Sequence, residues 1–341
     1  MNNFLNESSE AVAWVNSAKL RHSTGKFGKL VSAVVWTDER NDDGENIIPI
    51  DPSELVSGIN SDPYVLLHNH DPGCPKGQVL ESSQFETKAG RKFVVAVLGF
   101  FAGGDVLSFS GLNIDTGKLI PSPKSLPILG SDFWIELAAD PREVESAWLD
   151  RLAFDPRLHI KRSDLSHNSE EVLQELIRVG LPYVFLVWNP LITSIATEAG
   201  KSLYAAGHSW LRKMLENLVD RRNPVVDIQS SQDECSVSFL LRGKNIERHY
   251  AAHNALSSAA TQAAQLVKNL KERGTPAREL KYEFSAEALK WFPSFAILND
   301  GRIVTDNASL IAIEQLPTGL SLGLKRGDLP PAIEPTLKDV Q

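Results

Sequence analysis

The residues with the most chemical potential in this sequence lie together between positions 66 and 79. Within this stretch, four such residues fall in a window of seven positions, namely His68, His70, Asp71 and Cys74. These residue types act as bases, nucleophiles and metal ligands in proteins. Residues two apart on a strand point to the same face, so we expect His68 and His70 to converge on one substrate or one metal ion. The Gly and Pro residues that follow predict a tight turn, which would hold His70 at the mouth of a sheet.

The elements that must position this stretch are strands. Four apolar runs predict buried strands, at residues 29–36, 64–67, 92–101 and 106–109. Short strands separated by Gly, Asp and Asn indicate a small barrel or sandwich. We therefore expect a β-rich, barrel-like domain over residues 1–120.

The pattern changes after three prolines between positions 121 and 127, which indicate a linker. Residues 121–224 read as this linker followed by a helical and α/β region. Within it we expect a helix from Ser166 to Gly180, a strand at residues 183–188 and a helix at residues 210–219.

Residues 225–330 have the most regular pattern of the chain. Two strands, a long helix from Asn245 to Arg273, a strand with clean alternation at 280–284 and a hairpin through Asn299-Asp300-Gly301 form a ββαββ unit. The fold class predicted for the whole chain is α+β, with the barrel-like domain first and the ββαββ unit last.

The length and composition of the chain exclude some classes of function. The chain has 341 residues, 42% of them hydrophobic and 23% charged, which is typical of globular proteins. A net charge of -8 disfavours a broad nucleic-acid-binding face. Two distant cysteines form no disulfide framework, which fits the cytoplasm. We find no membrane span, no signal peptide and no phosphate loop, so we expect neither a membrane partner nor a cofactor.

The stretch around His70 also carries a family resemblance. The residues that carry it are Asp42–Glu45, Ile48–Pro52, Leu55, Val65–Leu67, His70-Asp71, Pro75–Val79 and the apolar strand at Phe93. Between residues 28 and 101, this run resembles the amino-terminal part of tailed-phage prohead proteases, which are similar to herpesvirus assemblins. The resemblance implies a phage-related serine endopeptidase that acts on a protein substrate and self-associates into a homo-oligomer.

In that family a histidine base activates a serine nucleophile. The resemblance assigns the base to His70 and the nucleophile to Ser110 or Ser108, which lie in the run of residues 106–112. This interval is shorter than in the family. Ser122, Ser125 and Ser131 restore the spacing, but they lie in or beside the proline-rich segment.

The third member of such a triad stays open between His68, His159 and a carboxylate such as Asp71. Cys74 is an alternative nucleophile. Alternatively, the domain keeps the fold of the family and has lost the catalytic triad. The chain would then be a non-catalytic binding or sensing protein, such as a cytosolic defence or regulatory factor with a protein partner.

A second resemblance uses the same histidines. Leu67–His70 followed by Gly73 is similar to the zinc motif of JAB/MPN metalloproteases, in which two histidines and a carboxylate bind the metal. Glu86 would supply the carboxylate, and Glu45 or Glu54 would activate the water. This resemblance implies a zinc-dependent hydrolase as the third function.

Overall fold

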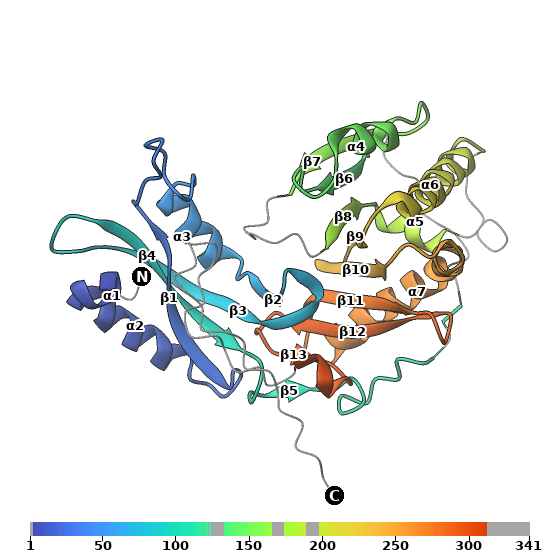
Figure 1. Cartoon of the computed structure of the whole chain (residues 1–341). Coiled ribbons are helices and arrows are strands. Elements are labelled where there is room, and N and C mark those ends of the chain that lie inside the picture. The colour runs from blue at the N-terminus through green and yellow to red at the C-terminus, as the bar shows by residue number, and fades with distance from the viewer. Residues whose placement is uncertain are drawn as a thin grey trace, which may run out of the picture.

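The computed structural model describes residues 3–118, 120–121, 123, 133–165, 174–188 and 198–311. These residues form two sheets that lie side by side, one built from the amino-terminal third and one from the remainder (Figure 1). Helices and strands are both abundant, so the fold class is α+β.

The amino-terminal sheet has four antiparallel strands in the order β1-β4-β3-β2. Their bounds are Lys29–Thr37 (β1), Val65–His68 (β2), Asp71–Glu86 (β3) and Lys92–Phe100 (β4). This sheet is open, because its edge strands β1 and β2 do not pair with each other. The described residues therefore contain no closed barrel, and the expected barrel-like domain is not confirmed.

This open sheet is covered by helices, which bury both of its faces. The helices are α1 (Asn3–Glu7), α2 (Ser9–His22) and α3 (Pro52–Ser61). Ala11 and Val15 of α2 pack against Phe93 and Val95 of β4. Ile59 of α3 belongs to the cluster of apolar residues on the opposite face. The sequence analysis predicted only strands here and missed α2 and α3, whose apolar faces are short.

The second sheet has nine strands in the order β5-β13-β12-β11-β10-β9-β8-β6-β7. Their bounds are Val106–Leu107 (β5), Ile135–Ala139 (β6), Ile160–Asp164 (β7), Glu175–Gly180 (β8), Pro224–Gln232 (β9), Cys235–Arg242 (β10), Ala277–Ser285 (β11), Lys290–Leu298 (β12) and Ile303–Val304 (β13). Strands from all three predicted regions of the chain therefore pair in one sheet.

One face of this sheet is covered by helices. They are α4 (Ser146–Ala153), α5 (Tyr183–Val187), α6 (Glu198–Glu216) and α7 (Ile246–Glu272), and two 3-10 turns follow at Asn217–Asp220 and Ala308–Ile311. The side chain of Asn245 caps α7 by accepting a hydrogen bond from the Arg248 amide. The elements β9, β10, α7, β11 and β12 form the ββαββ unit that the sequence predicts.

Two expectations between residues 166 and 188 are wrong. Residues 175–180 form strand β8 and no helix, because this segment pairs with both β6 and β9. Residues 166–173, where the predicted helix begins, lie outside the described residues. Residues 183–187 form helix α5 in place of a strand, with Val184 and Leu186 buried in the main core. Short apolar runs do not distinguish these two structures.

Gly77 on β3 lies where a side chain would collide with the backbone of β4. A Cβ atom at Gly77 would overlap the carbonyl oxygen of Gly99 on β4, and backbone atoms cannot move aside as a flexible side chain can. We expect Gly77→Ala to lower the free energy of unfolding by about 1 to 3 kcal/mol. Gly117→Ala is the control, since the added Cβ there makes only an ordinary contact with Asp115. Urea denaturation measures both, and equal stabilities of the two variants would contradict the close approach.

Candidate functional site

The two histidines lie at a hairpin turn. His68 ends β2 and pairs with Asp71, which begins β3, so Asn69 and His70 form a two-residue loop. Asn69 and His70 both have positive φ, 47° and 57°. This conformation is that of tight hairpin turns, whose twist matches that of the flanking strands. His68 and His70 therefore do not share a strand face, and the expectation that they point to the same side is wrong.

The Gly- and Pro-rich segment after His70 is a strand and not a turn. Strand β3 begins at Asp71 and runs through Pro72 and Pro75. Its pairing with β2 shifts register around Leu67, which accommodates prolines that cannot donate a backbone hydrogen bond. The chain turns at Asn69 and His70, before the prolines.

Asp71 connects the two sheets through an ion cluster. Its carboxylate accepts hydrogen bonds from Arg242 of β10, at 2.8 Å from Nη1 and 2.7 Å from Nη2. Arg242 Nη2 also donates to Glu283 Oε1 of β11 at 2.9 Å. The Gly73 amide donates to Asp71 at 2.9 Å. We call Asp71, Arg242 and Glu283 the clamp.

Gly73 allows the hairpin to lie against the clamp. A Cβ atom at this position would overlap the head groups of Glu283 and Arg242, and it would lie 3.2 Å from Leu240 Cδ1 of β10. The hairpin therefore crosses β10 and β11 on the face opposite α7, which packs against Phe239 and Leu241 of β10. The glycine in the conspicuous sequence motif serves this close contact.

The clamp sets the protonation of the neighbouring groups. Burial alone raises the pKa of Asp71, but the hydrogen bonds and positive charge of Arg242 outweigh it and lower the pKa below its ordinary value. Burial, and then the negative charge of Asp71, raises the pKa of the Cys74 thiol to about 11. Cys74 is therefore a neutral thiol at physiological pH, which is the unreactive form.

His70 is exposed and lies within electrostatic reach of Glu143, which precedes α4. Burial raises the pKa of the Glu143 carboxyl, and the charge of His70 opposes that shift. The His68 ring lies next to Asn69, 3.3 Å from its amide nitrogen. His159, the other proposed triad member, is exposed just before β7 at the edge of the large sheet.

The proposed serine nucleophiles lie elsewhere. Ser110 follows β5, and its hydroxyl donates to Asp306 Oδ1 at 3.0 Å and lies 3.4 Å from the Ser108 hydroxyl. Strand β5 is four positions from β10 in the sheet order. At the usual strand spacing, this places the serines about 19 Å across the sheet from the clamp. The structure does not bring them to the histidine turn, and Ser122, Ser125 and Ser131 lie outside the described residues.

The zinc-hydrolase hypothesis requires a set of metal ligands, and the part of the chain that the structure describes contains no such set. There, no three His, Cys, Asp or Glu side chains are grouped so as to hold an ion. Glu86 is at the far end of the 16-residue strand β3, and Glu54 is in the first turn of α3. Glu45 is exposed in the loop before α3.

The sequence analysis missed Arg242 and Glu283, the partners of Asp71. Arg242 is 171 residues from Asp71 and ends a predicted strand. No local motif indicates that it contacts the hairpin. The only available signal was indirect, since a buried carboxylate beside an apolar strand needs a positive partner.

Because Asp71 and Arg242 pair within the clamp, removing the charge of Asp71 should lower the stability of the protein. We expect Asp71→Asn to lower the free energy of unfolding by about 2 kcal/mol at pH 7, because Arg242 keeps its charge and loses its main partner. Asp62→Asn is the matched control, since Asp62 pairs with Arg278 at 3.6 Å but is 89% exposed. Urea denaturation measures both variants.

The difference in stability between wild type and Asp71→Asn should depend on pH. Because folding lowers the pKa of Asp71 from 3.8, its contribution is complete above about pH 4 and is lost as the pH falls through the lower folded-state value. The difference between wild type and Asp71→Asn should therefore stay constant from neutral pH to about pH 5 and shrink below pH 4. A difference that grows on acidification would refute the clamp.

Within the described residues, no helix combines the length and apolarity that a membrane crossing requires. No protein-family model, no curated protein and no solved structure matches the chain.

Proposed function

We propose that this protein is a non-catalytic binding protein. Its amino-terminal sheet is a prohead-protease-like scaffold that has no working triad, and its nine-stranded sheet carries the binding surface. The clamp is the observation that supports this proposal most strongly, because Asp71, which the sequence suggests as a triad member, pairs with Arg242 of the second sheet instead.

Three features of the candidate catalytic residues support a non-catalytic role. Asp71 is only 9% exposed and is held by Arg242, so it is not available to orient a histidine base. Cys74 is a neutral thiol. The hydroxyl of Ser110 is hydrogen-bonded to a carboxylate, Asp306, and not to an imidazole.

The serine-peptidase reading requires a histidine within about 2.6 to 3.2 Å of a serine hydroxyl. Ser108 and Ser110 are four strand positions from the strand that contacts the hairpin. Bringing them to His70 would require separating β5 from the sheet or breaking the clamp. The binding reading requires no such rearrangement.

A serine-reactive fluorophosphonate probe tests the proposal. We expect wild type, His70→Ala and Ser110→Ala to give the same background labelling as heat-denatured protein, while a known serine protease is labelled in the same reaction. The physical reason is that a serine without a nearby base is a weak nucleophile at neutral pH.

Labelling of a single serine that disappears in His70→Ala would overturn the proposal, because it would demonstrate an activated nucleophile. Asn69→Ala serves as the matched control in that case. It alters the same turn but leaves the imidazole in place, so a general disturbance of the hairpin can be distinguished from loss of a base.

A further inference from the structure

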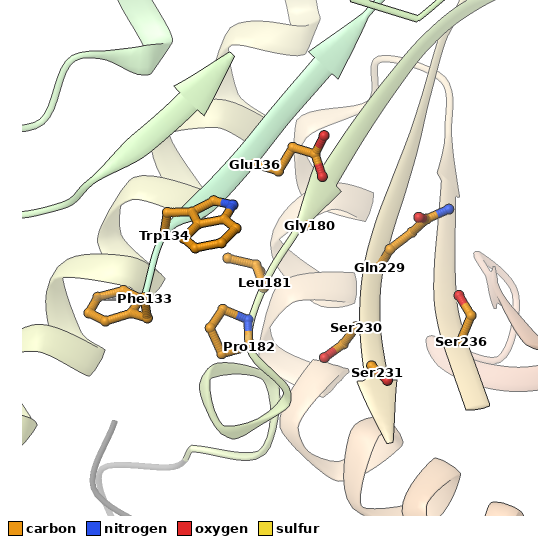
Figure 2. Close-up of a pocket in the computed structure, with 10 residues that line it drawn as sticks. All are labelled: Phe133, Trp134, Glu136, Gly180, Leu181, Pro182, Gln229, Ser230, Ser231 and Ser236. Atoms are coloured by element: carbon orange, nitrogen blue, oxygen red, sulfur yellow. The ribbon is translucent and has the colours of Figure 1, made fainter. Parts of the chain in front are cut away.

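A cavity of about 410 Å³ opens at one end of the nine-stranded sheet. It lies where β8 and β9 end and where β6 and β10 begin (Figure 2). This volume is within the range of about 300 to 1,000 Å³ that is typical of small-molecule sites. The residues that line it are Phe133, Trp134, Glu136, Gly180, Leu181, Pro182, Gln229, Ser230, Ser231 and Ser236.

One side of the cavity is an aromatic and aliphatic wall. Trp134 is 48% exposed, which is high for a tryptophan next to a buried strand. The ammonium group of Lys161 lies 3.5 Å from the ring centroid and covers one face of the indole. The exposure that remains therefore belongs to the other face and the ring edge. In Figure 2, the ring lies next to Leu181 and Pro182 at this side of the cavity.

The other side is lined with hydroxyl and amide groups held in place by their neighbours. Gln229 Nε2 donates to Asp227 Oδ2 at 2.6 Å, which fixes the orientation of the amide. Ser231 and Ser236 are exposed on β9 and β10. Ser230 is only 7% exposed, and its hydroxyl has no hydrogen-bond partner in the part of the chain that the structure describes. Ser230 alternates with Gln229 along β9, so its side chain lies on the opposite face of the strand, whereas Ser231 shares the face of Gln229.

Glu136 and Gly180 form the floor between these two sides. They are directly opposite each other in the pairing of β6 with β8. A Cβ atom on Gly180 would lie 3.1 Å from Glu136 Cβ and 3.3 Å from its Oε2, so the glycine leaves room for this carboxylate. Glu136 Oε1 accepts a hydrogen bond from the Ser163 hydroxyl at 2.6 Å, which orients the carboxylate.

The charge of the lining selects against anions. Among the described residues that line the cavity, Glu136 is the only charged one, and the nearby ammonium group of Lys161 lies on the Trp134 ring. Asp227 lies two residues before Gln229, on the same face of β9. Its charge is balanced by Lys281 at 3.7 Å and by Arg178 at 3.9 Å. A phosphate or carboxylate ligand would be repelled by Glu136. A neutral ligand that offers several hydroxyl groups would satisfy the serine, amide and carboxylate groups without this penalty.

From these contacts we infer that the cavity binds a neutral sugar ring. The hydroxyl groups of the sugar bond to Glu136, Gln229 and Ser231, and its apolar face packs on Trp134. Sugars present both kinds of surface, and a site of convergent polar groups beside an aromatic wall is complementary to them. This inference rests on the proposed binding function and gives it a ligand class.

Calorimetric titration and saturation-transfer NMR test the inference on the full chain. The probes are D-glucose, D-galactose, D-mannose and N-acetyl-D-glucosamine, each up to about 50 mM because single sugar rings bind weakly. We expect at least one of them to bind saturably. We also expect Trp134→Ala and Gln229→Ala each to weaken that binding about tenfold, which corresponds to about 1.4 kcal/mol.

Two control variants remove the same types of side chain elsewhere. Phe154→Ala removes an aromatic ring that is 76% exposed, and Gln265→Ala removes an amide that donates a hydrogen bond to Asn269. Both should bind the sugar as wild type does. If Trp134→Ala fails to fold, Ser236→Trp replaces it, because a large side chain at this exposed strand position fills the cavity without removing a contact.

Three outcomes would overturn the inference. They are no binding of any of the four sugars, equal binding by wild type and Ser236→Trp, and tighter binding of glucose 6-phosphate or AMP than of the neutral sugars. None of these outcomes depends on serine labelling. A failure here therefore leaves the proposed non-catalytic function standing, while labelling that requires His70 would overturn that function whatever the sugars do.

Discussion

The ion cluster of Asp71, Arg242 and Glu283 joins two sheets that come from different parts of the chain. Each sheet has its own apolar core, and the amino-terminal one is covered by helices on both faces. Their contact is therefore not imposed by either core alone. It relies on the hairpin that carries Asp71 and on a second contact, in which Phe101 of the first unit packs against Phe295 and Ile297 of β12. Further polar contacts between the two units include the ion pair of Asp62 with Arg278 and the hydrogen bond from Gln78 to the Gly301 carbonyl.

This arrangement accounts for the residue types of the histidine stretch. A tight two-residue loop, a carboxylate and small residues are also what a hairpin needs to turn sharply and lie closely against another sheet. His70 adopts positive φ because the loop has only two residues. Gly73 is small because Arg242 and Glu283 occupy the space that a side chain would need.

The cavity lies away from the clamp, at the end of β8 and β9, and its residues come from four strands. The sequence analysis did not single out any of them for chemistry, since serines, a glutamine and a tryptophan at strand ends have no distinctive spacing. Only pairing in the sheet brings Glu136 opposite Gly180 and places Gln229 near Ser236. The polar groups then converge because β8 and β9 end where β6 and β10 begin.

The sequence by itself determined the elements with strong periodicity. These are strands β1, β2 and β4, and the ββαββ unit with its long helix α7, because repeated apolar positions and a capping Asn245 are local signals. Tertiary structure decided the rest. Residues 175–180 became a strand only because β6 and β9 flank them, and residues 183–187 became a helix under α7. It also decided that Asp71 meets Arg242 and that Ser110 does not meet His70, because the sheet order, which no local pattern encodes, sets those distances.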